Sequence, residues 1–112
     1  GRAMKRNTTV RMVYMTAANQ AEAKKLARLL VEQKAAACVN ILGSISSVYE
    51  WKGKVENAKE IALVAKTTDA AYPRLERIVR ENHSYECPCI VAWAIDKGNP
   101  PFLQWVGEQT AK

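Results

Sequence analysis

Two copies of a strand, helix, strand pattern follow one another in this chain, and this order constrains the fold more than any other feature. Apolar alternation predicts strands, and apolar residues at helical spacing predict the helices between them. We expect strands at residues 10–16, 36–42 (resuming at 48–51), 60–67 and 89–95, with helices that begin after Asn19 and near Pro73. The order βαββαβ favours an α+β, ferredoxin-like antiparallel sheet with both helices on one face.

The predicted helices have recognisable start signals. Asn19 suits an N-cap, and Glu22 stands three residues later, where its side chain can reach back to a free backbone amide. Pro73 suits the first turn of the second helix, and Pro100-Pro101 suits the start of an extra C-terminal helix. The residues expected to dock the three helices are Ala23, Leu26, Ala27 and Leu30, then Tyr72, Leu75, Ile78 and Val79, then Phe102, Leu103, Trp105 and Val106.

The second strand is expected to be long and bent, because Gly43-Ser44 interrupts its apolar pattern. Lys52-Gly53 suits a hairpin tip, since glycine adopts a positive φ without a steric penalty. Trp51 and Trp93 add more apolar surface than two helices on one face would cover. We therefore expect the sheets of several subunits to pack together.

Length and composition indicate one domain with few special requirements. Of the 112 residues, 48% are hydrophobic, which suffices for a core but leaves a single chain only marginally stable. Residues 10–112 are expected to form the domain. Residues 1–9 are expected to be a flexible tail, in which Gly1-Arg2-Ala3 before Met4 has the character of an expression remnant.

Charge and cysteine content narrow the location and the partners. The net charge is +6, but Arg2, Lys5, Arg6 and Arg11 supply most of it, so we do not expect nucleic-acid binding. No apolar run is long enough to span a membrane, and no membrane partner is expected. The 3 cysteines show no disulfide framework, which favours reduced thiols and a cytoplasmic location.

Four short segments, in their order and spacing, identify a family. The chain resembles the CutA family of divalent-cation tolerance proteins over nearly everything from Val10 to Glu108. The segments are Cys38-Val39-Asn40-Ile41, Tyr49-Glu50-Trp51-Lys52-Gly53-Lys54, Glu60 to Lys66-Thr67, and His83-Ser84-Tyr85-Glu86-Cys87-Pro88-Cys89. The resemblance implies a homotrimer in which the long second and third strands extend pairing into a neighbouring subunit. It also implies a role in metal-cation tolerance and homeostasis.

Soft ligand atoms cluster in the last of these segments. Cys87 and Cys89 flank Pro88 and would project to one side of a regular strand, with His83 four residues before them. Thiolate and imidazole ligands favour Cu(I) or Zn(II) over hard ions. The alternative is that the cysteines are small buried hydrophobes and that His83 caps a helix. No metal is expected to be required for folding.

The family resemblance adds one ligand and qualifies the metal. Some bacterial CutA proteins resemble copper binders that use a cysteine at the end of the first strand and two tandem histidines. Here Met15 and Asn82 occupy the cysteine and first histidine positions, and His83 remains. Methionine is a soft ligand without charge, so Cu(I) is favoured over Cu(II), with zinc as another candidate.

The family resemblance also implies a cleft between subunits, bordered by the segment from His83 to Pro88. Its candidate lining residues are Lys66, Tyr49, Glu60, Tyr85 and Glu86, a set that could bind a small anion or metabolite. The alternative is that Lys66 and Glu60 form interface salt bridges. Trp51, Trp93, Trp105 and Cys38 are assigned to packing or interfaces. With 1 histidine and no recognisable nucleophile and base pair, we do not expect an enzyme.

Three functions remain open at this point. The first is the trimeric metal-binding protein. The second is a trimeric signalling or scaffold protein, similar to the PII regulators, that binds a small anion through Lys66 and Glu86 or binds an unidentified protein partner. The third is an RNA-recognition module, for which residues 60–67 lack the required basic and aromatic strand motif. A copper chaperone with a Cys-x-x-Cys loop is excluded, because residues 16–19 contain no cysteine.

Overall fold

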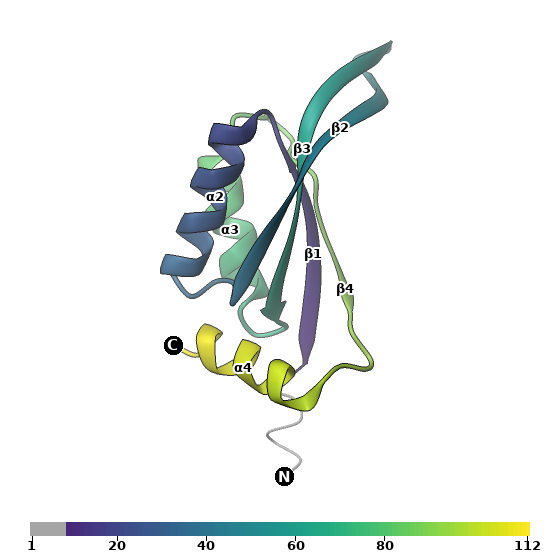
Figure 1. Cartoon of the computed structure of the whole chain (residues 1–112). Coiled ribbons are helices and arrows are strands. Elements are labelled where there is room, and N and C mark those ends of the chain that lie inside the picture. The colour runs from purple at the N-terminus through teal and green to yellow at the C-terminus, as the bar shows by residue number, and fades with distance from the viewer. Residues whose placement is uncertain (1–8) are drawn as a thin grey trace.

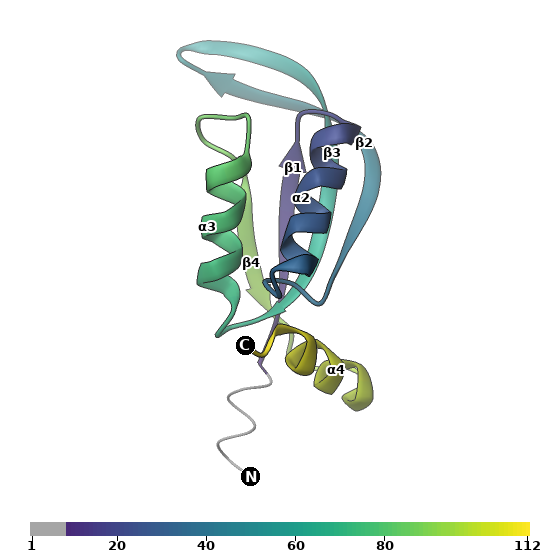
Figure 2. The same cartoon turned by 90° about the vertical axis from the view of Figure 1, so that its left-hand side faces the viewer.

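The computed structural model describes residues 9–112 and has the predicted α+β architecture. Its elements are β1 (Val10–Ala17), α2 (Gln20–Glu32), β2 (Cys38–Trp51), β3 (Lys54–Thr68), α3 (Tyr72–Asn82), β4 (Ile90–Ala94) and α4 (Pro100–Thr110). The strands form one antiparallel sheet in the order β2-β3-β1-β4. Helices α2 and α3 cover one face, and α4 lies at the end of the sheet (Figures 1 and 2). The βαββαβ prediction and the extra C-terminal helix are confirmed.

The predicted domain begins where β1 begins, and residues 1–8 of the predicted tail lie outside the described residues. In the described part of the chain, no helix is long and apolar enough to cross a membrane.

The capping signals at α2 act as predicted, with one difference. The Asn19 side chain accepts a hydrogen bond from the Glu22 amide at 2.8 Å, which satisfies one of the free N–H groups of the first turn. The Glu22 carboxylate reaches back one residue further than in a standard capping box and accepts from the Ala18 amide at 2.8 Å. The start of α2 is therefore fixed at the end of β1.

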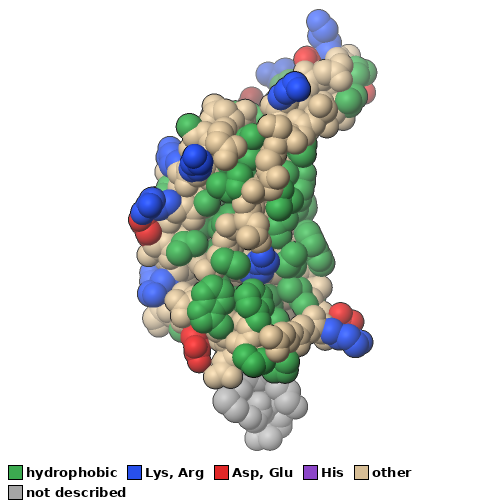
Figure 3. Space-filling view, in the orientation of Figure 1, with side chains coloured by type: hydrophobic (Ala, Val, Ile, Leu, Met, Phe, Trp, Pro, Cys, Tyr) green, Lys and Arg blue, Asp and Glu red, His purple; other side chains and the backbone are tan. Residues whose placement is uncertain are grey.

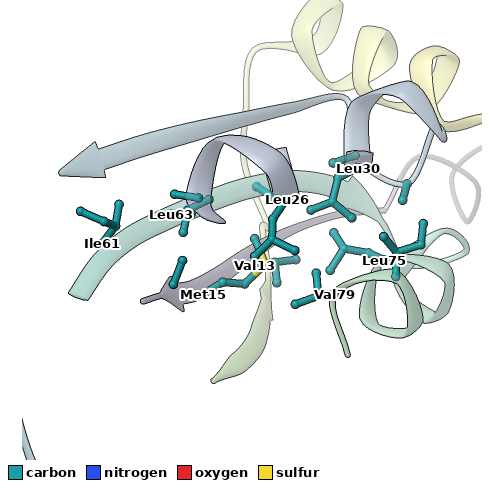
Figure 4. Packing of buried hydrophobic residues seen from close by; sticks show 14 residues of the cluster. Val13, Met15, Leu26, Leu30, Ile61, Leu63, Leu75 and Val79 are labelled. Carbon is teal, nitrogen blue, oxygen red and sulfur yellow. The ribbon is translucent and has the colours of Figure 1, made fainter. Parts of the chain in front are cut away.

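The core lies between the two helices and the face of the sheet that they cover (Figure 4). Val13 and Met15 on β1 and Leu63 on β3 point to this face and are fully buried. The helices contribute the predicted apolar stripes, of which Leu26, Leu30, Leu75, Ile78 and Val79 are buried. Alternate residues of the same strands point to the other face, because side chains in a strand alternate.

Strands β2 and β3 continue past the sheet as a two-stranded hairpin, residues 44–60, which we call the arm (Figure 1). A bulge between Ile41 and Gly43 bends β2 at the predicted place. Lys52 and Gly53 form the tip, with φ of 51° and 83°. The prediction that the return strand begins at Glu60 is wrong, since β3 begins at Lys54, immediately after the turn.

Among residues 9–112, no helix covers the second face of the sheet, which we call the bare face (Figure 1). Trp93 is 48% exposed on it, and Trp51 is 41% exposed on the arm. Trp105 on α4 is 39% exposed, and its ring lies 5.7 Å from that of Phe102. The tryptophans assigned to packing therefore lie outside the core of a single chain. Figure 3 shows hydrophobic side chains along the sheet and α4, whereas Lys and Arg gather on the helical side and the arm tip.

Helix α4 docks on the end of the sheet through a smaller cluster. Val106 is fully buried there beside Val10 and Ala37, with Leu103 partly buried. The Arg74 guanidinium donates to the Lys34 carbonyl at 2.6 Å and to the Thr110 carbonyl at 3.1 Å. One side chain of α3 therefore binds the C-terminal ends of both α2 and α4.

Candidate functional site

A cavity of about 380 Å³ lies between the arm, the end of β1 and the segment between α3 and β4. We call it the arm pocket. Its lining residues are Thr16, Tyr49, Trp51, Glu60, Tyr85, Glu86, Cys87 and Cys89. Four of the five predicted cleft residues are among them, and the exception is Lys66. Its lining charges are carboxylates, with no Lys or Arg.

Glu60 is the central polar group of the arm pocket. It is only 8% exposed, and one carboxylate oxygen accepts a hydrogen bond from the Tyr85 hydroxyl at 2.9 Å. Burial alone would raise the pKa of Glu60, but hydrogen bonds from the Ser47, Tyr85 and Thr16 hydroxyls outweigh it and lower that pKa. Burial and the Glu60 carboxylate raise the pKa of Tyr85. Glu60 is therefore ionised at neutral pH, and Tyr85 is a neutral donor.

His83 fixes the segment that carries Tyr85. Its side chain is fully buried, and Nε2 lies 2.8 Å from the Thr16 carbonyl oxygen, to which it donates. Nδ1 accepts from the Tyr85 amide at 3.0 Å. Both contacts are satisfied by one neutral tautomer, with the proton on Nε2. Both ring nitrogens are therefore used, and a metal ion could bind here only if one of these contacts broke.

Glu22 holds the same segment from the other side. Its carboxylate accepts from the Ser84 amide at 2.7 Å and from the Ser84 hydroxyl at 3.1 Å. Burial acts to raise the pKa of Glu22, and hydrogen bonds from Ala18 and Ser84 reverse this and lower it. The sequence indicated Glu22 as a capping residue only. Its second contact joins residues 62 positions apart, and no local pattern predicts that.

Cys87 and Cys89 are both exposed and both line the arm pocket. The predicted alternation along a strand does not apply to them, because β4 begins at Ile90, after both cysteines. Burial, followed by the Glu60 charge, raises the pKa of the Cys89 thiol. Cys38 lies elsewhere, at the start of β2 opposite Lys66 on β3. The chain therefore brings two of its thiols together and separates the third.

The other predicted site residues lie away from the two thiols. Met15 is fully buried in the core, on the helix-covered face. The Lys66 ammonium donates to the Asn40 side chain on the bare face, in a row with Cys38, Met12 and Trp93. Among residues 9–112, no group of three or more His, Cys, Asp or Glu side chains is placed to hold a metal ion. The predicted ligand set is thus reduced to the two cysteines at the arm pocket.

Comparison with known proteins gives consistent results. The family model described as CutA1 divalent ion tolerance protein matches residues 11–109. The divalent-cation tolerance protein CutA of Thermus thermophilus is 40% identical over 99 residues, which cover 88% of this chain and 96% of that protein. Mouse protein CutA is 41% identical over 102 residues, which cover 91% of this chain. This chain spans 58% of the mouse protein and 63% of the Xenopus laevis homolog.

Solved structures agree with the sequence comparison. Rice CutA1 superposes with a TM-score of 0.90 at 38% identity, covering 93% of this chain and 95% of that chain. The CutA of Archaeoglobus fulgidus, described as periplasmic, gives a TM-score of 0.88 at 39% identity, with 91% and 99% coverage. An Arabidopsis relative is named chloroplastic. These names describe tolerance to divalent cations or give only the family, and none names a reaction. The chain belongs to the CutA1 family of divalent ion tolerance proteins.

Proposed function

We propose that the protein is a homotrimer that binds soft metal cations, Cu(I) in preference to Cu(II), and that it contributes in this way to cation tolerance and homeostasis. The names of the relatives support the cation role, because two of them describe divalent-cation tolerance. The observation that carries the metal proposal is the pair of exposed thiols, Cys87 and Cys89, at one pocket. A cytoplasmic location, where thiols stay reduced, agrees with this proposal and remains a prediction.

The two thiols favour one of the candidate metals over the other. Thiolate sulfur is a soft ligand that selects Cu(I), an ion that is stable with as few as two sulfur ligands. Zinc takes four ligands in structural sites, and residues 9–112 offer no group of three. Zinc binding would therefore require ligands from a second chain. We rank Cu(I) first and zinc second.

Protons must leave the thiols when a metal binds. The raised pKa of Cys89 means that its thiol is mostly protonated at neutral pH. Metal binding then competes with the proton, so the apparent affinity should rise as the pH rises toward that pKa. The Glu60 carboxylate near the thiol would favour a bound cation.

Several exposed side chains support the trimer. Val48, Val55 and Trp51 lie on the arm, and Val91 and Trp93 lie on β4, all between 41% and 71% exposed. Exposed apolar surface of this kind marks sites of association. The arm presents strand edges beyond the sheet, and such edges are suited to pairing with another chain. We infer that the arm and the bare face together form the subunit interface.

The small-anion alternative has less support. The charged residues that line the arm pocket are Glu60 and Glu86, and Lys66 lies outside it. Two carboxylates without a lining cation would repel an anion. A scaffold role toward an unidentified protein partner stays open as the second candidate, because the exposed apolar surface would also suit it.

One experiment tests the metal and the trimer together. The reduced protein is titrated with Cu(I) and Zn(II) against a competing chelator, and native mass spectrometry gives the mass of the assembly and the metal per chain. We expect a trimer with one Cu(I) per chain, lost in the joint Cys87→Ser and Cys89→Ser variant. Cys38→Ser is the matched control, since Cys38 lies outside the pocket. A trimer that binds no metal in competition with the chelator would exclude the metal role.

A further inference from the structure

Glu60 is a buried carboxylate that is not among the proposed metal ligands. Its carboxylate is 8% exposed and ionised, yet no Lys, Arg or His of residues 9–112 lies in ion-pair distance of it. Its partners are the neutral hydroxyls of Ser47, Tyr85 and Thr16. Buried charges in proteins are normally paired, because transfer of a charge out of water is unfavourable. Within residues 9–112, the buried carboxylate of the arm pocket therefore has no cationic side chain at ion-pair distance.

The walls of the pocket are aromatic. Tyr49 and Trp51 from the arm and Tyr85 from the segment before β4 line it together with Glu60. The faces of aromatic rings carry negative charge density and attract cations within about 6 Å of the ring centre. Glu86, which is exposed, adds a second carboxylate to the lining. All these groups favour a positive charge.

The size and chemistry of the lining decide which kind of cation fits. Hard metal ions such as Ca²⁺ take about six to eight oxygen ligands, and the described residues supply no suitable group of even three. Aromatic carbon does not replace those oxygens. A cavity of about 380 Å³ lies at the lower end of the range for small-ligand sites. An ammonium group on a short alkyl chain matches both the charge and the apolar walls.

We propose that the arm pocket binds a small alkylammonium compound, with its charged nitrogen at Glu60 and its alkyl part between the rings of Tyr49, Trp51 and Tyr85. This site uses the carboxylate and the rings rather than the thiols. It is therefore a binding function beyond the metal site, in the same pocket that Cys87 and Cys89 line.

The test uses n-butylammonium as the probe and n-butanol as its neutral counterpart. Binding to the full chain is measured by ligand-observed NMR and calorimetry in the presence of EDTA, with the Cys87→Ser and Cys89→Ser background alongside the wild type. We expect n-butylammonium to bind both proteins with similar affinity, and n-butanol to bind at least about tenfold more weakly. Equal binding of the alcohol, or no binding of the amine, would overturn the proposal.

Two variants locate the site. Glu60→Gln removes the charge and keeps the shape, and it should weaken amine binding at least about tenfold. Glu32→Gln makes the same charge change on the outer side of α2, where Glu32 pairs with Arg28, and it should leave binding unchanged. Trp51→Leu should weaken binding several-fold. Because Trp51 also lies on the proposed interface, sedimentation must show that this variant keeps the assembly of the wild type.

The outcomes distinguish this inference from the proposed function. Loss of amine binding in Glu60→Gln with Cu(I) binding retained would support a separate organic-cation site. If the wild type binds no amine and Glu60→Gln instead dissociates the trimer, Glu60 pairs with a cationic side chain of a neighbouring subunit. That result would overturn the ligand proposal while leaving the metal proposal untouched.

Discussion

The two faces of the sheet differ in what their side chains do. On the helix-covered face, Val13, Met15 and Leu63 are fully buried among aliphatic groups from α2 and α3. On the bare face, Val91 and Trp93 are 53% and 48% exposed. The arm pocket, with its carboxylates and thiols, lies on the bare side. One face therefore supplies the stability of the single chain, and the other supplies the groups available for binding. Because side chains alternate along a strand, adjacent residues should differ sharply in their roles.

The largest effect should come from truncating the covered face. Leu63→Ala removes a fully buried side chain from the core, and it should lower the free energy of unfolding by about 2–5 kcal/mol. Val64→Ala changes the next residue of β3, on the bare face, and should cost about 1 kcal/mol or less. Urea unfolding followed by circular dichroism measures both. Equal losses would mean that the two faces contribute equally to the stability of the folded chain.

The bare face should govern assembly instead. In the proposed trimer, Trp93→Ala should weaken subunit association by about 2 kcal/mol or more, since large aromatic residues dominate interface energies. The control is Val31→Ala, an apolar residue that is 44% exposed on α2, on the opposite side of the molecule. Sedimentation at a series of protein concentrations measures the dissociation. A trimer that is insensitive to Trp93→Ala would move the interface away from β4.

The difference in burial between the two faces also explains which helices and strands could be predicted from the sequence. The covered face produces strong periodic patterns, so the element order, the Asn19 cap and the α3 stripe were correctly predicted. The first part of β3 was missed, because residues 54–59 are mostly exposed and show no apolar alternation. Only pairing with β2 across the Lys52-Gly53 turn makes this segment a strand. Apolar periodicity therefore fails to detect a strand whose side chains are exposed on both faces.

The candidate site was only partly predictable for the same reason. Five cleft residues were predicted, and the structure gathers Tyr49, Glu60, Tyr85 and Glu86 in the arm pocket but leaves Lys66 outside it. Thr16 was not considered, and Trp51 was assigned to packing rather than to the pocket lining. Their positions depend on how β1, the arm and the segment before β4 meet in space. Alternation along β1 already separates Met15 from Thr16, which places the methionine in the core.

A pH dependence should arise at the junction between the faces, where Glu22 binds the Ala18 and Ser84 amides. The folded-state pKa of Glu22 is lowered, so its contribution is present above the unfolded pKa and is lost as the pH falls through the folded value. Glu22→Gln should therefore cost about 1–2 kcal/mol at pH 7 and progressively less below about pH 4.5. Urea midpoints at pH 3 to 7 measure this.

One control variant and one binding measurement test whether the Glu22 charge causes this effect. Glu32→Gln, on the same helix but in an exposed pair with Arg28, should change stability little at any pH. Cu(I) or amine binding by Glu22→Gln should weaken as well, because the segment that carries Tyr85 loses one of its attachments. A constant difference between Glu22→Gln and the wild type across the pH range would show that packing, and not the charge, determines the effect.

The smallest effects should separate the body of the chain from the arm. Lys34 and Lys52 both adopt a positive φ, of 59° and 51°, a conformation that strains any side chain with a Cβ. Glycine relieves the strain but makes the unfolded chain more flexible, which leaves a net gain of roughly 0.5–1 kcal/mol at each position. Lys34 follows α2 and its carbonyl binds Arg74, so Lys34→Gly should raise the global free energy of unfolding. Lys52 is at the arm tip, far from the core, so Lys52→Gly should slow hydrogen exchange only near the tip.

If Lys52→Gly instead raises global stability as much as Lys34→Gly does, the arm unfolds together with the core. That result would overturn the distinction between the arm tip and the body of the chain.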